Sequence, residues 1–252
     1  MRDKTQDDRY FILTLFAIAR ELERKGQYSP TKRIQLAVGL PPEHYGSLKE
    51  KFAAYFKRCG PVKFVYKDRS YTIFLDQVMV FPQAFAAVVP RSSVVVKTLR
   101  LFIIDIGGYT TDVLLLQNGK PDLQFCRSLE TGVIIMNNEV IRKVSTKFDM
   151  KIEDEHISAV LQNRETYLPD EVKEEIFKAA RLHANDILHQ LRELQVDLRA
   201  NPAIFIGGGS ILLQPYLSES ALVGKVEFMD SPNANALGYE MLGESQMART
   251  RG

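Results

Sequence analysis

The sequence predicts an α/β protein, in which short apolar strands alternate with amphipathic helices. Two almost wholly apolar runs, Leu101–Ile104 and Ala203–Ile206, are typical of strands that are buried on both faces of a sheet. Each run leads directly into a glycine-rich turn. The chain has 252 residues, of which 45% are hydrophobic and 25% charged, so it is long enough for one large or two modest domains with proper cores.

The first third of the chain predicts a helix, then a strand and a second helix, then two more strands. The opening helix has apolar residues at helical spacing, and the later strands are rich in β-branched and aromatic residues. Pro82 is expected to begin a short helix, because proline suits the first helical position. The predicted features are the apolar helix positions Phe11, Leu15, Ile18, Ala19 and Leu22, the strand Arg33–Gly39, the helix Tyr45–Phe56, and the strands Val62–Tyr66 and Tyr71–Phe81.

A polar boundary at residues 90–98 precedes a predicted three-strand meander and a series of helices. The dipeptide Asn118-Gly119 supplies the hairpin turn between the second and third strands of the meander. The predicted elements are the strand ending near Asp105, the strands Asp112–Gln117 and Leu123–Leu129, the helix Val133–Phe148, a short piece over Glu153–Gln162, a long helix from Pro169 to about Arg199, the strand Ala203–Ile206 and the helix Ile211–Ser218.

The turn after the first buried strand has the composition of a phosphate-binding loop. Gly107 and Gly108 lack a Cβ, so the backbone N–H groups of this turn could approach an anion closely. Thr110 and Thr111 would add hydroxyl donors. Asp105 ends the strand, where a carboxylate is well placed to hold a hydrated Mg²⁺ beside a phosphate. The pattern indicates a nucleotide with its metal, and the alternative is an ordinary β-hairpin with a polar turn.

A second glycine cluster follows the other buried strand. Gly207, Gly208 and Gly209 cost backbone entropy, so either the turn is very sharp or something approaches its backbone closely. The alternative is a tight strand-to-helix turn in which Ser210 is the N-cap of the following helix. Because both clusters follow buried strands of one chain, a nucleotide held between them is the better interpretation.

Four segments resemble, in the same order, motifs of the actin and sugar-kinase superfamily, and most closely the actin-like plasmid-segregation proteins of the bacterial ParM (StbA) type. Residues 77–87 are similar to the first connecting helix, and residues 105–112 (DIGGYTTD) to the second phosphate motif. Residues 204–210 (IFIGGGS) resemble the adenosine motif, and residues 233–239 are similar to the second connecting helix. The similarity extends over roughly residues 30–245.

This resemblance implies an actin-like (ribonuclease H-like) two-domain fold that binds ATP or GTP with Mg²⁺. Gln83 falls where the family carries a residue that orients the attacking water, and Asp105 would hold the metal through water, so both are candidate catalytic residues. The nucleotide-binding residues are expected to be Gly107, Gly108, Tyr109, Thr110, Thr111, Lys173, Glu174, Gly207, Gly208, Gly209 and Ser210.

Lys173 and Glu174 are included because the superfamily uses polar residues at the start of the corresponding helix to hold the ribose and the edge of the base. The alternative is a charge-rich helix N-terminus, including Glu175, that is exposed to solvent and complements the helix dipole. His183 and His189 lie six residues apart on the same predicted helix, hence on different faces, so they are not expected to bind a metal together.

The resemblance divides the chain into a first domain, residues 1–91 plus 231–252, and a second domain, residues 92–230. The family opens with a strand that carries an Asp-x-Gly phosphate motif, and nothing similar precedes Ile34. The first domain is therefore expected to be incomplete at its N-terminus. Either the sequence is a fragment, or the protein has lost half of its phosphate clamp.

The implied function is a filament-forming ATPase that segregates plasmid DNA through a DNA-binding adaptor protein. Its expected partners are further copies of itself and the adaptor, without direct binding to nucleic acid or membrane. One alternative is a non-hydrolysing nucleotide-binding or scaffold protein that has lost the first phosphate loop. Another is a sugar or acetate kinase of the same superfamily, although no segment resembles a substrate-binding insertion.

Composition agrees with a cytoplasmic protein. The 33 basic and 31 acidic residues give no electrostatic reason to expect nucleic-acid or membrane binding. Cys59 and Cys126 match no metal-binding spacing and are expected to be reduced thiols. No membrane helix or signal peptide is evident, because Arg20 and Glu21 interrupt the longest apolar stretch near the start.

Overall fold

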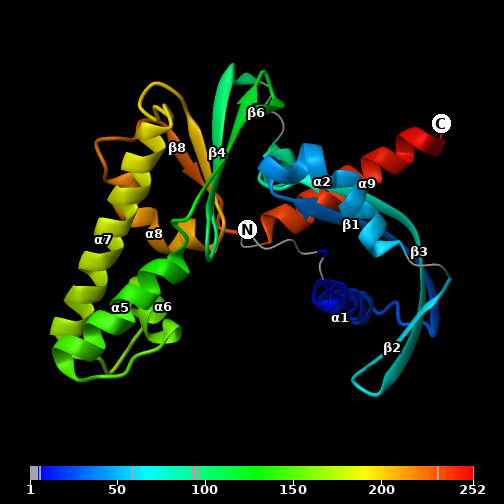
Figure 1. Ribbon diagram of the computed structural model, residues 1–252, viewed down its shortest axis with the longest axis horizontal. Helices are drawn as coiled ribbons and strands as arrows, with labels where there is room; N and C mark the ends of the chain where they lie inside the picture. The colour runs from blue at the N-terminus through cyan, green and yellow to red at the C-terminus, as the bar shows by residue number, and fades with distance from the viewer. Residues whose placement is uncertain are drawn as a thin grey trace. The chain divides into compact units, whose positions relative to one another are not determined.

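The computed structural model describes residue 5 and residues 7–57, 60–91, 95, 97–231 and 233–251. It divides into two compact units, which are described separately (Figure 1). The first unit comprises Met1–Leu40, His44–Pro82 and Gly243–Gly252, and the second comprises Pro41–Glu43 and Gln83–Leu242. The division into domains at residues 91 and 231 stays a prediction.

The first unit contains a three-stranded sheet with β3 (Arg69–Pro82) in the centre. β1 (Thr31–Leu40) runs parallel to β3, and β2 (Val62–Tyr66) pairs with the other side of β3 in the antiparallel direction. The helices α1 (Arg9–Arg24) and α2 (Pro42–Phe56) pack their aromatic and aliphatic side chains into the same core as this sheet. The five apolar positions predicted for the opening helix are the five residues that α1 buries.

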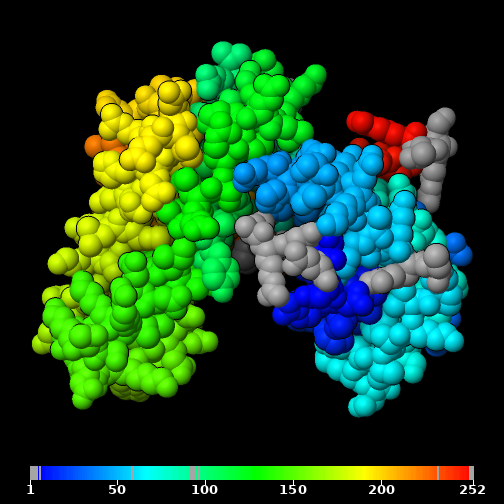
Figure 2. All heavy atoms as spheres, in the orientation of Figure 1, coloured from blue at the N-terminus to red at the C-terminus, as the bar shows by residue number. Residues whose placement is uncertain are grey.

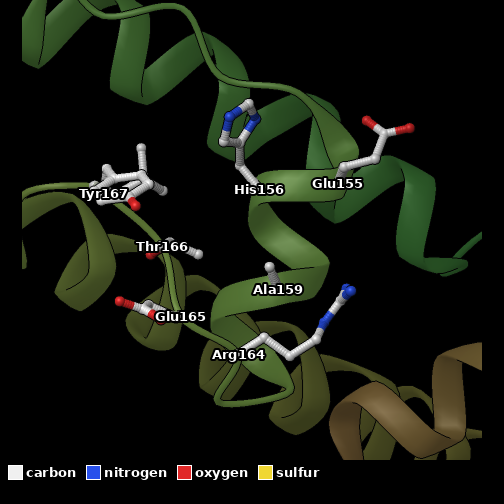
Figure 3. Close-up of a pocket in the computed structure, with 8 residues that line it drawn as sticks. Glu155, His156, Ala159, Arg164, Glu165, Thr166 and Tyr167 are labelled. Atoms are coloured by element: carbon white, nitrogen blue, oxygen red, sulfur yellow. The ribbon is translucent and has the colours of Figure 1, made fainter.

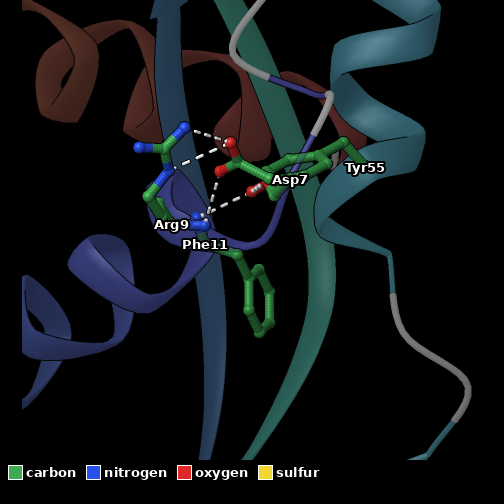
Figure 4. Close-up of polar contacts among 4 residues, drawn as sticks. All are labelled: Asp7, Arg9, Phe11 and Tyr55. Atoms are coloured by element: carbon green, nitrogen blue, oxygen red, sulfur yellow. Dashed lines mark hydrogen bonds and ion pairs between the residues drawn. The ribbon is translucent and has the colours of Figure 1, made fainter.

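A tyrosine of α2 fixes the start of α1 (Figure 4). The hydroxyl of Tyr55 accepts a hydrogen bond from the N–H of Phe11 at 2.8 Å and donates one to the carbonyl of Asp7 at 2.8 Å. The carboxylate of Asp7 accepts from the N–H of Arg9 at 3.0 Å and pairs with its guanidinium. Asp7 and Tyr55 therefore supply partners at a helix end that has unsatisfied backbone groups.

The second unit contains a five-stranded sheet in the order β6-β5-β4-β7-β8. β4 (Arg100–Ile106), β5 (Thr111–Gln117) and β6 (Lys120–Leu129) form the predicted antiparallel meander. β7 (Ala203–Ile206) runs parallel to β4, and β8 (Val226–Phe228) runs parallel to β7. The carboxyl ends of β4 and β7 therefore meet at one edge of the sheet, where both glycine-rich turns begin.

The helices of the second unit lie on both sides of this sheet, and several are drawn in green to orange in Figure 1. In the space-filling view, green and yellow spheres of α5 and α7 form much of the visible surface of this unit (Figure 2). The elements are α3 (Phe85–Val88), the 3-10 helix η1 (Val89–Arg91), α5 (Val133–Phe148), α6 (Asp154–Leu161), α7 (Asp170–Glu193), α8 (Gly208–Ser218) and α9 (Ala234–Arg251), whose last residues belong to the first unit.

Alternate residues of β4 enter two different cores, as a strand buried on both faces requires. Phe102 and Ile104 pack with the core that α5, α6, α7 and α8 cover. Leu101 and Ile103 pack on the opposite face with residues of α3 and with Ala234 at the start of α9. The α/β fold class predicted from the sequence is confirmed.

Several predicted boundaries are wrong. Pro82 does not begin a helix: it is the last residue of β3 and pairs with Leu40, and α3 begins only at Phe85. The long helix α7 ends at Glu193, because Gln195 takes a left-handed conformation with φ 62°. The second glycine cluster lies partly inside α8, whose N-cap is Gly207 and not Ser210. The short strand β8 was not predicted.

The structure locates one of the two cysteines. Cys126 is a buried free thiol, and burial raises its pKa to about 11; Cys59 lies outside the described residues. In the part of the chain that the structure describes, no helix combines the length and apolar character that crossing a membrane demands.

Candidate functional site

The first glycine turn is held rigidly against the start of α5. The N–H of Gly107 donates to the carbonyl of Thr110 at 2.9 Å and closes the turn between β4 and β5. The carbonyls of Gly107 and Gly108 accept from the first N–H groups of α5, at 3.1 and 2.8 Å. Within the described residues, the N–H groups of Gly108 and Tyr109 have no hydrogen-bond partner. These two N–H groups are therefore available to an anion.

A glycine that the sequence analysis missed makes this packing possible. A Cβ on Gly132, the N-cap of α5, would run into the backbone of Gly108 and Tyr109. The N–H of Gly132 also donates to the carbonyl of Tyr109 at 3.1 Å. Gly132 belongs to neither glycine cluster, so nothing in the local sequence pattern marks it as part of the turn.

Close contacts require a glycine at two of the three glycine positions in the second turn, Gly207 and Gly209. Gly207 has φ 87°, and a Cβ there would lie 2.5 Å from Oδ1 of Asp105. A Cβ on Gly209 would lie 2.5 Å from a methyl carbon of Ile106. Gly208, by contrast, has nothing within 4 Å of a built Cβ. The fully buried Ser210 donates its hydroxyl to the carbonyl of Gly207 at 2.8 Å and so closes the turn.

The two glycine turns line one cavity of about 380 Å³, a size in the usual range for small-molecule sites. Four of the predicted binding residues meet there. α6 contributes Ser158, and its C-cap residue Gln162 follows four positions later; neither side chain has a hydrogen-bond partner among the described residues. The lining residues are Gly107, Gly108, Val133, Ser158, Gln162, Gly208, Gly209, Ile211 and Leu212.

Asp105 lies at the junction of the two turns. Its Oδ2 accepts a hydrogen bond from Nδ2 of Asn235 at 3.1 Å. Burial, and secondarily the negative charge of Asp112, raise the pKa of Asp105 to about 6, while the hydrogen bond from Asn235 opposes this shift. In the described part of the chain, the ionised carboxylate of Asp105 is stabilised by only this one hydrogen bond, so a cation nearby would stabilise it further.

Gln83 precedes Ala84, whose backbone is connected to this carboxylate through the side chain of Asn235. The N–H of Ala84 donates to Oδ1 of Asn235 at 2.9 Å, and the other end of the same amide bonds Asp105. The Gln83 side chain has no hydrogen-bond partner among the described residues. Asn235 was not singled out from the sequence, because an asparagine at the start of a helix usually indicates a cap.

The remaining predicted binding residues do not line this cavity. The hydroxyl of Thr110 donates to Asp112 at 3.3 Å, and the fully buried Thr111 donates to the carbonyl of Thr131 at 3.2 Å. The Tyr109 side chain is 69% exposed. Lys173 pairs with Asp170 on its own helix.

Neither Lys173 nor Glu174 lines the cavity between the glycine turns. His183 contacts the carbonyl of Thr131 through Nε2 at 3.0 Å, and burial lowers its pKa. No cluster of three or more potential metal-ligating side chains occurs in the described parts of the chain.

A second cavity, of about 450 Å³, lies between α6 and the segment after it (Figure 3). It contains none of the predicted binding residues. Nδ1 of His156 already faces the N–H of Glu153 at 3.2 Å, within a capping box. In Figure 3 the charged groups of Glu155, Arg164 and Glu165 do not converge on one point. This cavity therefore has no arrangement that indicates a particular ligand.

Glu175 joins two helices behind the site. Its buried carboxylate accepts from Lys143 and, at 3.0 Å, from Lys147, both on α5. These hydrogen bonds lower its pKa to about 2. Glu175 is thus a structural residue that ties α7 to α5, the helix whose N-terminus supports the first glycine turn.

Replacing Glu175 with glutamine is expected to lower the free energy of unfolding at pH 7 by about 1–3 kcal/mol, because the amide lacks the negative charge that pairs with both lysines and has only one acceptor oxygen. The folded pKa lies below the ordinary value of 4.5, so this stabilisation is complete above pH 4.5 and disappears as the pH falls towards 2. Urea unfolding should therefore show a smaller difference between the two proteins at pH 3 than at pH 7. Glu171→Gln, an exposed position on the same helix, is the control, and an equal effect of both substitutions would contradict this role.

Two family models match the chain. Residues 103–219 match the C-terminal model of the archaeal actin homologue MreB-like family, and residues 1–85 match the N-terminal domain of actin-like proteins. No curated protein sequence matches the chain.

Many solved structures share the fold. Ta0583, an archaeal actin homologue, is 22% identical with a TM-score of 0.73 over 91% of this chain and 75% of that one. ParM of Bacillus thuringiensis, solved with ATP, is 11% identical with a TM-score of 0.71 over 98% and 77%. Alp12, solved as a filament, is 15% identical with a TM-score of 0.64 over 92% and 74%. The two family matches and the shared architecture together show that the chain has the actin fold.

Proposed function

We propose that the chain binds a nucleoside triphosphate together with Mg²⁺ between its two glycine turns. The observation that carries this proposal is the convergence of Gly107, Gly108, Gly208 and Gly209 on one cavity. Asp105 does not line this cavity, but its Oδ1 lies against Gly207 in the second of the two turns. Solved relatives support it, because Ta0583 has been determined with ADP and the Bacillus thuringiensis ParM with ATP and with AMPPNP.

Asp105 fits a magnesium ion held through water. Mg²⁺ keeps several of its waters and takes few protein carboxylates, and Asp105 offers one carboxylate whose ionised form has little compensation. The bound ion would supply positive charge to the phosphates. The N–H groups of Gly108 and Tyr109 would donate to phosphate oxygens, and Gln83 would orient a water for attack on the terminal phosphate.

We further propose that nucleotide binding drives self-association into filaments, and that such filaments move plasmid DNA through an adaptor protein. Alp12 was solved as a filament, and several relatives of the same fold are ParM proteins. A nucleotide controls assembly if it binds the assembling conformation more tightly than the free one. Hydrolysis would then weaken the filament.

Calorimetric titration with ATP tests the first step, in Mg²⁺ and again in excess EDTA. Binding that requires Mg²⁺ supports the site, and no binding by a folded sample overturns it. Phosphate release and high-speed sedimentation with ATP, ADP and no nucleotide then separate a hydrolysing filament protein from a non-hydrolysing one. A chain that binds ATP but stays in the supernatant at high concentration would contradict the filament proposal.

Ser158 and Gln162 are expected to contact the nucleoside end of the ligand, because they face the glycine turns across the cavity. Each alanine substitution should weaken Mg·ATP binding about fivefold, since one hydrogen bond contributes about 1 kcal/mol. Neither should change the melting temperature. Lys173→Ala is the comparison, because the family resemblance assigns this role to Lys173. If Lys173→Ala weakens binding and the Ser158 and Gln162 variants do not, the nucleoside lies towards α7.

A further inference from the structure

The backbone after Gln83 is held in a strained turn. The N–H of Phe85 donates to the carbonyl of Gln83 at 2.6 Å, and Ala84 between them has φ 63° and ψ −54°. These angles define a γ-turn with positive φ, the rarer and more strained of the two γ-turn forms. Ala84 has a Cβ and is completely buried. Such a conformation persists only where the surrounding contacts hold it.

Asn235, in the first turn of α9, makes the contact that holds this turn. Its Oδ1 accepts the N–H of Ala84 at 2.9 Å, and its Nδ2 donates to Oδ2 of Asp105 at 3.1 Å. An amide group has one acceptor oxygen and one donor nitrogen, so each neighbour requires one particular end of it. The strained turn and the carboxylate are therefore connected through a single side chain.

α9 has little freedom to move away from this turn. A Cβ on Gly238 would run into the backbone of Ala86, so the two main chains are in close contact three residues beyond Asn235. Ala234, beside Asn235, is buried in the core on this face of the sheet. The start of α9 thus presents the Asn235 amide from a fixed position.

We propose that Asn235 is a positioning residue that couples the ligand state of Asp105 to the turn that carries Gln83. This inference rests on the proposed nucleotide and metal site. When a metal and nucleotide engage Asp105, the carboxylate becomes fixed, and the amide passes this constraint to the N–H of Ala84. The turn that carries Gln83 is then held more firmly in the loaded protein than in the empty one. A residue that merely supported the turn would need only the acceptor oxygen of Asn235.

Two substitutions separate coupling from support. Asn235→Asp keeps an acceptor for the N–H of Ala84 but removes the donor to Asp105, so at pH 8 it should hold the turn and break the connection. Asn235→Ala removes both contacts. Asn233→Ala is the matched control, because this exposed asparagine precedes the same helix. Circular dichroism and calorimetry establish that each variant is folded and how much Mg·ADP saturates it.

The readout is hydrogen exchange of the peptide that covers residues 83–88, measured by mass spectrometry on the full chain. In the unmodified protein and in Asn233→Ala, saturating Mg·ADP should slow this exchange about tenfold, a typical size for coupling between sites. In Asn235→Asp and Asn235→Ala the response should disappear although nucleotide is bound. If only one of them folds, that variant decides the question.

Three results would overturn the inference. An unchanged response in either Asn235 variant would mean that the connection does not run through this amide. An unmodified protein that binds Mg·ADP without a response at residues 83–88 would reject the coupling and leave the nucleotide site intact. No binding of Mg·ADP by the folded, unmodified protein would instead reject the proposed function. It would also reject this inference, which depends on that function.

Discussion

Asp105→Asn is expected to reduce Mg²⁺-dependent ATP binding at least about 100-fold, and at the same time to stabilise the empty protein at pH 8. The loss of binding follows because the amide has no charge to attract a hydrated magnesium ion. The gain in stability follows because the ionised Asp105 is poorly compensated in the folded protein. The substitution should therefore improve the fold while it removes the proposed activity, a compromise common at functional sites.

The direction of the change in stability follows from the titration of Asp105. The pKa of Asp105 is about 6 in the folded protein, against an ordinary value of 3.8. Between these two values the unfolded chain has released its proton and the folded chain has kept it, so stability falls as the pH rises. Once the pH is well above 6 the loss is complete, and we expect it to be about 3 kcal/mol. Asparagine does not titrate, so its advantage should grow from pH 4 to beyond pH 6 and then remain constant.

Urea unfolding of both proteins from pH 4 to pH 8 measures this difference, and calorimetry with Mg·ATP measures binding. The acid titration of Glu175 is common to both proteins, so it cancels in the comparison. Asp186→Asn, on the exposed side of α7, is the control and should change neither quantity. Tight Mg·ATP binding by Asp105→Asn would show that the metal is held elsewhere. A difference in stability that is independent of pH would show that Asp105 is not the titrating group.

The parts of the fold that depend on local pattern could be predicted from the sequence. The five apolar positions of α1, the two-sided burial of β4 and the turn at Asn118-Gly119 all follow from periodicity or turn chemistry within a few residues. Asn118 and Gly119 both take positive φ, as that turn requires. Such features need no knowledge of what packs against them.

The boundaries that were wrong depend on the surrounding structure. Pro82 was predicted to begin a helix because proline suits that position, but β3 continues through it, paired with β1, until the strained turn at Ala84. α7 ends early at a left-handed Gln195, a residue type with no special preference for that conformation. β8 has three residues and a place in the sheet only because β7 lies beside it.

In the candidate site too, some residues could be predicted from the local sequence and others could not. The glycine turns were evident because clustered glycine after an apolar strand has few structural explanations. Ser158 and Gln162 were not, because polar residues in and just after a short helix usually face solvent. Asn235 acts through contacts with residues about 130 and 151 positions away in the chain. No pattern in a single sequence reports such contacts.

Gly132→Ala is expected to destabilise the protein by about 3 kcal/mol or more, the largest effect of any single methyl group we consider. The added Cβ would collide with the backbone of Gly108 and Tyr109, and backbone atoms cannot rotate aside as a flexible side chain can. Relief would require the start of α5 and the first glycine turn to separate, with loss of the hydrogen bonds from Gly132, Val133 and Ile134 to that turn. Urea unfolding with calorimetry measures both consequences.

Gly208→Ala is the informative control, because it adds the same methyl group to the other turn where nothing lies within 4 Å. Its stability should stay within about 0.5 kcal/mol of the unmodified protein or rise slightly, since alanine favours a helix over glycine. Gly208 nevertheless lines the cavity, so a bound nucleotide would meet the new methyl group, and Mg·ATP affinity should fall about tenfold or more. A stable Gly132→Ala would show that the turn can move away from α5. Full ATP affinity in Gly208→Ala would show that the nucleotide does not approach this backbone. Comparing the two substitutions thus shows which glycine is needed for stability and which for nucleotide binding.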